Sequence, residues 1–149
     1  MAETYIGAPI KRREDIRFIT GAGTYVDDIK LPHTVHAAIL RSPHAHARIL
    51  SIDTQKAQSL PGVALVFTLK DIGELDATVP IRMYKIPGLE KYLQPSLAQD
   101  MVRYVGEPVA VVVAESRYLA EDALEGIDVQ YEVLQEVMEE REALKDKVL

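Results

Sequence analysis

The sequence predicts a single globular domain that combines β-strands with α-helices. Residues 108–114, Pro-Val-Ala-Val-Val-Val-Ala, form a continuous apolar run suited to burial on both faces of a sheet. After Ser116, apolar residues recur at helical spacing. The chain has 149 residues, 48% hydrophobic and 27% charged, which is the size and polarity of one domain that spans residues 1–149.

The first third of the chain predicts an arm followed by two strands. Residues 1–24 predict an amino-terminal arm, in which residues 10–24 are mixed and charged, hold Gly21 and Gly23 and suit a short helix or turn. Residues 35–40 are apolar apart from His36 and predict a strand that ends before Pro43. Residues 48–52 predict a second short strand. The loop at Pro43 favours a hairpin-like pairing of these two strands.

A short helix and a third strand follow. The Thr54 hydroxyl is positioned to cap a helix, and Pro61-Gly62 ends it. Residues 63–68 predict a strand, and residues 69–73 a second short helix.

Residues 76–99 predict a long surface loop of low regularity. Three prolines interrupt this segment, and its apolar and aromatic side chains are more numerous than a solvated loop favours. We expect the loop to form an interface with another polypeptide.

The carboxyl-terminal third predicts a helix, a strand and a polar tail. Ser116 caps the helix, whose Leu119, Ala123 and Leu124 face should form the core with strand 109–113. Gly126 is expected to supply a left-handed stop. Residues 129–133 alternate and predict a half-buried strand, while residues 136–147 predict a helical or frayed end.

The composition excludes several classes of function. The chain has no cysteine, which excludes iron–sulfur ligation, Cys-zinc sites, disulfides and thiol nucleophiles. A net charge of −6 argues against nucleic-acid binding. No secretory signal is visible, and no apolar run approaches the ~18 residues of a membrane span, so we expect a cytoplasmic location.

The histidines are candidate metal ligands, and all of them lie between positions 33 and 46. The four are His33, His36, His44 and His46. On an extended segment His44 and His46 would project to the same side. A site also needs a third ligand, for which Asp27, Asp28 and Asp53 are candidates, and histidine in a turn more often binds backbone or solvent. The sequence therefore favours no metal site.

Other candidate groups have simpler interpretations. Gly21-Ala22-Gly23 lacks the preceding strand and following apolar helix of a dinucleotide site. The acidic pairs Glu14-Asp15 and Asp27-Asp28 are adjacent in sequence, so their side chains diverge. No serine has a nucleophile-elbow context. Glu107 precedes the core strand, where turn chemistry is favoured over catalysis. We therefore predict no catalytic, cofactor-binding or metal-binding residue.

A series of motifs, in order, resembles the start of a molybdenum hydroxylase large subunit. The series includes Arg13-Glu14-Asp15-Ile16-Arg17-Phe18, Tyr25-Val26-Asp27-Asp28, Leu40-Arg41-Ser42-Pro43-His44-Ala45-His46-Ala47-Arg48, Tyr104-Val105-Gly106-Glu107-Pro108-Val109-Ala110 and Val129-Gln130-Tyr131-Glu132. The resemblance covers nearly the whole chain. It departs at Gln135, where the family often has proline, and in the acidic tail that follows.

The resemblance implies both fold and role. The family includes xanthine dehydrogenase, aldehyde oxidase and the aerobic carbon monoxide dehydrogenase large chain, and the motifs look most like the last of these. In the family this region is the α/β-hammerhead domain, an α+β fold with a mixed sheet and flanking helices. The resemblance implies a structural and docking domain that is inactive alone.

The cofactors and partners are likewise implied. The molybdenum–pterin cofactor would lie in the remainder of the large subunit, with iron–sulfur clusters and FAD in partner subunits or domains. Expected partners are that remainder, the iron–sulfur subunit and a flavin subunit. A stand-alone interaction or assembly module, or a separately encoded subunit, stays open as an alternative, as does a small metal-dependent enzyme that uses the histidines.

Overall fold

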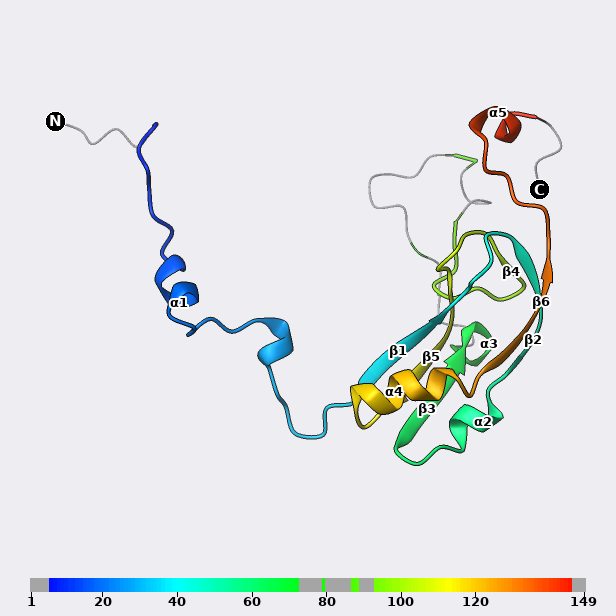
Figure 1. The fold of residues 1–149 in the computed structure, drawn as a ribbon, viewed down its shortest axis with the longest axis horizontal. Helices are drawn as coiled ribbons and strands as arrows, with labels where there is room; N and C mark the ends of the chain where they lie inside the picture. Colours follow the sequence, from blue (N-terminus) through cyan, green and yellow to red (C-terminus); the bar gives the residue numbers. More distant parts are fainter. Residues whose placement is uncertain (1–5, 73–78, 80–86, 89–92, 146–149) are drawn as a thin grey trace. The chain divides into compact units, whose positions relative to one another are not determined.

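The structure, a computed structural model, describes residues 6–72, 79, 87–88 and 93–145 (Figure 1). The chain divides into two compact units, Met1–Thr34 and Val35–Leu149. The first unit extends beyond residue 24, where the sequence predicted the arm to end. We describe each unit by itself.

The first unit holds helix α1 (Asp15–Ile19) and the 3-10 helix η1 (Val26–Asp28), neither of which has a buried residue. Gly21 has φ +74° and ends α1, where its N–H donates to Phe18 O and the Ala22 N–H to Arg17 O. This is a helix carboxyl-terminal motif that requires a left-handed residue. Gly21 is therefore explained by chain geometry without a phosphate ligand.

The second unit contains two antiparallel sheets. The first sheet has the order β1-β5-β3, from His36–Arg41, Pro108–Ala114 and Val63–Thr68. The second has the order β4-β2-β6, from Met101–Val102, Ala47–Asp53 and Asp128–Val133. Every pairing among the described strands is antiparallel. The α+β class is confirmed, although the strands form two antiparallel sheets in place of one mixed sheet.

The predicted hairpin between the first two strands is wrong. β1 pairs with β5 and β2 pairs with β4 and β6, so consecutive strands lie in different sheets. At the end of β1 the Ser42 N–H donates to Glu107 O at 2.9 Å, and its carbonyl accepts from Gly106 N at 2.8 Å. These bonds tie the chain to the turn before β5, which separates β1 from β2.

Within its described residues the second unit also has helices α2 (Gln55–Gln58), α3 (Leu69–Ile72), α4 (Arg117–Leu124) and α5 (Glu140–Ala143). The predicted cap of α4 is confirmed, since Leu119 N–H donates to Ser116 Oγ at 3.2 Å. The predicted Thr54 cap is wrong. Asp53 Oδ1 accepts from Gln55 N instead, while the Thr54 hydroxyl accepts from the Gln58 side chain.

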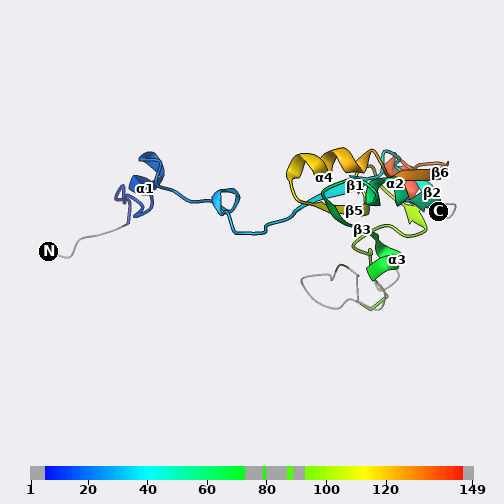
Figure 2. The ribbon, with the colours of Figure 1, turned by 90° about the horizontal axis from the view of Figure 1, so that it is seen from below.

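Helix α4 lies along one side of the first sheet (Figures 1 and 2). Of the predicted helix face, Ala123 is buried and Leu124 partly buried, but Leu119 is 37% exposed and Ala120 is buried in its place. Most of the buried apolar residues in the described part of the chain belong to two clusters. One contains Ala57, Val66, Ala110, Val112, Ala123 and Ile127, and the other Ala47, Ala98, Val102 and Val109.

The predicted loop 76–99 lies largely outside the described residues. At its described end Leu93, Gln94, Ser96 and Gln99 are exposed, as expected of a surface loop, but Leu97 and Ala98 are buried, at 4% and 1% exposed. Ala98 N–H donates to Pro108 O at 2.7 Å and so joins this end to the start of β5. The short strand β4 follows, and the sequence pattern did not reveal it. Among the helices that the structure describes, none is long and apolar enough to cross a membrane.

Gly126 has a different role from the one predicted. It is absent from the glycines with positive φ, so it does not supply a left-handed stop. A Cβ at this position would lie 2.9 Å from both the Cα and the N of Ala57. Glycine therefore permits close approach of the backbone after α4 to α2.

We expect Gly126→Ala to destabilise the chain by about 1–3 kcal/mol, because the added methyl group would displace backbone atoms in a packed core. Urea unfolding measures this. Tyr118→Ala, at a side chain that is 79% exposed on α4, is the control and should change stability by less than about 0.5 kcal/mol. Equal, small effects of the two variants would show that α2 does not pack against Gly126.

Candidate functional site

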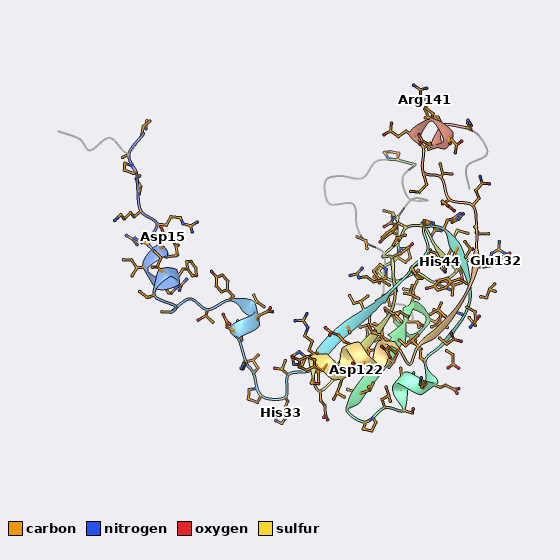
Figure 3. All side chains as sticks on the ribbon, viewed as in Figure 1. Asp15, His33, His44, Asp122, Glu132 and Arg141 are labelled. Carbon is orange, nitrogen blue, oxygen red and sulfur yellow. The ribbon has the colours of Figure 1, made fainter. Side chains whose placement is uncertain are left out.

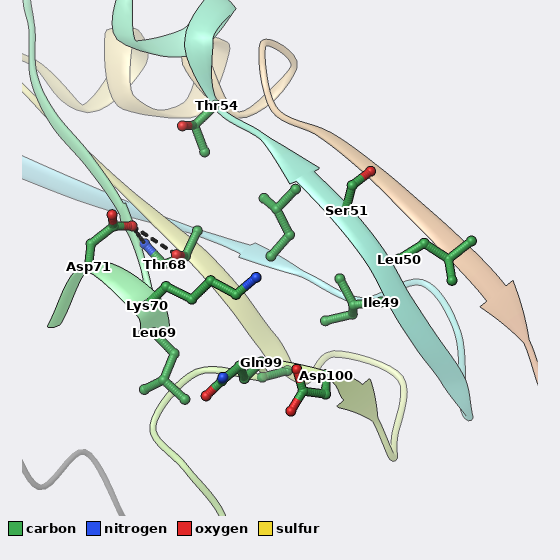
Figure 4. Close-up of a pocket in the computed structure, with 12 residues that line it drawn as sticks. Ile49, Leu50, Ser51, Thr54, Thr68, Leu69, Lys70, Asp71, Gln99 and Asp100 are labelled. Atoms are coloured by element: carbon green, nitrogen blue, oxygen red, sulfur yellow. Dashed lines mark hydrogen bonds between the residues drawn. The ribbon is translucent and has the colours of Figure 1, made fainter. Parts of the chain in front are cut away.

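Among the described residues of the second unit, a pocket lies between β2 and the corner where β3 meets α3. It has a volume of about 340 Å³ and is lined by Ile49–Ile52, Thr54, Thr68–Asp71 and residues 98–100. Figure 4 shows the Lys70 side chain extending across it toward β2. The polar groups at its wall are a lysine, two aspartates and neutral side chains.

One of these carboxylates already has a structural role. Asp71 Oδ2 accepts from the Thr68 N–H at 2.7 Å and from the Thr68 hydroxyl at 2.8 Å (Figure 4). The Thr68 backbone bond and then its hydroxyl bond lower the pKa of Asp71. The pair closes the first turn of α3, as a capping residue does. Asp71 is thus explained by the fold.

Two of the histidines have separate partners in the structure. His46 is 6% exposed; its Nδ1 donates to Gln135 O at 2.8 Å, and its Nε2 lies 3.3 Å from Met101 Sδ. His44 (Figure 3) stands edge-on to Tyr131, with ring centroids 4.9 Å apart. In the part of the chain that the structure describes, no group of three or more His, Cys, Asp or Glu residues could hold a metal ion.

Ser42 and Tyr131 both contact His44, and neither was among the candidate residues that the sequence offered. Ser42 is 2% exposed, and its hydroxyl accepts from His44 N and donates to His44 O. Burial raises the pKa of Tyr131, and a side-chain hydrogen bond with Ser42 opposes that shift. The motif Arg41-Ser42-Pro43-His44 therefore shapes a turn against β6.

Glu107 is a buried carboxylate, 2% exposed. Its side chain accepts from Arg103 N–H, and its own N–H donates to Tyr104 O. Gly106 has φ +91°, and its carbonyl accepts from the Arg41 guanidinium at 2.9 Å. These bonds fit the turn role that the sequence favoured, and they connect the turn 103–107 to the end of β1.

The chain thus folds as an α+β domain. In it the polar side chains of Ser42, Asp71 and Glu107 close turns or cap a helix. The chain belongs to the aldehyde oxidase and xanthine dehydrogenase a/b hammerhead domain family, whose model matches residues 20–135.

Known relatives match nearly all of this chain. The nicotine 6-hydroxylase large subunit of Paenarthrobacter nicotinovorans is 45% identical over 94% of this chain and 17% of its own length. The carbon monoxide dehydrogenase large chain of Afipia carboxidovorans is 46% identical over 87% of this chain and 15% of its own. The chain therefore spans less than a fifth of the length of these two relatives.

Solved structures show the same fold. A crystal structure of Cu,Mo-CO dehydrogenase aligns with a TM-score of 0.86 at 42% identity, covering 96% of this chain and 17% of that chain. Quinoline 2-oxidoreductase from Pseudomonas putida 86 aligns with a TM-score of 0.81 at 45% identity, covering 93% and 18%. The hammerhead fold and the expected similarity to carbon monoxide dehydrogenase large chains are both confirmed.

The hydrogen bonds at Thr68 predict how Asp71 titrates. Because the pKa of Asp71 in the fold is lowered from 3.8, its contribution to stability is present above that pH and is lost as pH falls through the folded pKa. Thr68→Val keeps the backbone donor and removes the hydroxyl, so the Asp71 pKa should rise partway toward 3.8. Carboxyl NMR titration measures it; an unchanged pKa would show that the hydroxyl bond is absent.

Proposed function

We propose that this chain is the amino-terminal structural and docking domain of a molybdenum hydroxylase large subunit, of the kind found in carbon monoxide dehydrogenase. The main support is that this chain matches only a small part of the length of each relative. The relatives retain this fold within chains of which it makes up 15–18%. In this proposal the domain supports the reacting centre by holding neighbouring parts of the enzyme in place.

The range of relatives supports a structural role. Enzymes named for nicotine, quinoline and carbon monoxide match this domain at 42–46% identity. The identity to this chain is nearly the same although the named substrates differ widely. This favours substrate selection by another part of the enzyme.

The residues present do not fit a molybdenum–pterin or iron–sulfur group. There is no cysteine, and iron–sulfur clusters are held by cysteine thiolates. His46, Asp71 and Glu107 already have partners in the fold. In the complete enzyme we place the molybdenum–pterin cofactor in the remainder of the large subunit, and the iron–sulfur clusters and FAD in partner subunits or domains. A cytoplasmic location is part of the same proposal.

A segment exchange tests the proposal. This chain would replace the matching segment of the Afipia carboxidovorans carbon monoxide dehydrogenase large chain, and a flexible linker of equal length would replace it in the control. We expect the exchanged chain to be recovered folded and the linker control to be lost, because only the former supplies the packing surfaces. Recovery of both chains alike would contradict a docking role and favour a stand-alone module.

The isolated chain should have no activity of its own. With aldehydes, purines or carbon monoxide as donors, we expect no reduction of an acceptor dye, and elemental analysis should find no stoichiometric molybdenum or iron. A purified molybdenum hydroxylase serves as the positive control. Dye reduction above the buffer blank, or about one metal per chain, would support the reading as a metal-dependent enzyme instead.

A further inference from the structure

The first sheet has two faces with different surroundings. On one face Ala110, Val112 and Val66 are buried in the core beneath α4. Side chains alternate along a strand, so Val111, Val113 and their neighbours on β1 and β3 project from the other face. Figure 2 shows α4 on a single side of this sheet.

The opposite face consists of apolar residues in two cross-strand rows. The pairing places Ile39 and Phe67 beside Val111, and Ala37 and Leu65 beside Val113. Ile39 is 41% exposed and Leu65 54% exposed. Phe67, Val111 and Val113 are half-buried. We name these six residues the outer face.

The outer face is more apolar than the solvent-exposed face of an ordinary antiparallel sheet. Antiparallel sheets with one face in water alternate apolar residues toward the core with polar residues toward solvent. Here both faces are apolar, which explains why the sequence of β5 suggested burial on two sides. Contiguous exposed apolar patches mark interaction surfaces. Within the described residues of the second unit, α3 contacts β3 where that strand ends, and no helix runs across the sheet as α4 does.

We infer that the outer face docks an apolar surface of the remainder of the large subunit; this rests on the proposed function. The length of the relatives favours this occupant. Cu,Mo-CO dehydrogenase keeps the same fold at a TM-score of 0.86, in a chain of which it covers 17%. Most of such a chain lies outside this domain and is available to cover the face.

The absence of cysteine allows a test that barely perturbs the fold. Leu65→Cys places a thiol on the outer face. Leu50→Cys, at a leucine that is 62% exposed on β2 of the second sheet, is the matched control. Each variant is prepared as the isolated chain and as the exchanged carbon monoxide dehydrogenase large chain. Both are treated with N-ethylmaleimide, and labelling at each position is followed by peptide mass spectrometry.

We expect the thiols at positions 65 and 50 to react readily in the isolated chain. In the exchanged large chain the thiol at position 65 should react at least about tenfold more slowly, since a covered site reacts only during local opening. The thiol at position 50 should keep its rate. Urea unfolding of the isolated variants checks that neither substitution alters the domain.

The other outcomes overturn the inference in distinguishable ways. A folded exchanged chain in which position 65 reacts at the isolated rate, or both positions are protected equally, refutes the assignment of this face and leaves the proposed function standing. Protection in the isolated chain that grows with concentration identifies a second copy as the occupant. Concentration-independent protection there identifies another segment of this chain. Failure to recover the exchanged chain, where the parent is recovered, contradicts the proposed function and the inference together.

Discussion

The packing of strand β5 is the constraint on which the rest of the second unit depends. β5 lies between β1 and β3, so both of its edges are hydrogen-bonded. Val109 belongs to one buried cluster, whereas Ala110 and Val112 belong to the other. The turn before β5 holds Glu107 and Gly106, which bind the end of β1. One apolar strand therefore joins two sheets, two clusters and α4.

The sequence predicted most elements because their signals are local. The apolar run of β5, the Ser116 cap and the alternation in β6 each lie within a few neighbouring residues. Pairing depends on contacts between distant segments, and this is why the hairpin expected of β1 and β2 is wrong. Gly126 is a second example. Glycine is required there by the nearby Ala57 backbone, which is distant in sequence, and not by the local turn. β4 is too short to give a pattern.

The turn role of Glu107 was predictable from the sequence, but the partners of the histidines and of Ser42 required the structure. The histidines are close in sequence, yet His46 contacts Gln135 and Met101 while His44 contacts Tyr131. Ser42 gave no signal, because its role is to bind the backbone of His44 and Glu107. The outer face could be suspected from β5, but its extent required the register of β1 and β3. A domain that uses its polar groups for turns and leaves one sheet face apolar suits a supporting role.

We infer that this domain is built to be covered by a larger polypeptide. The most direct measurement is an electron cryomicroscopy structure of the large chain that carries this segment. We expect β5 and α4 to keep their arrangement, and Ile39, Leu65 and Phe67 to be buried against residues outside the domain. A domain that keeps its fold but is joined to the enzyme only by its chain ends, with those side chains in solvent, would contradict it.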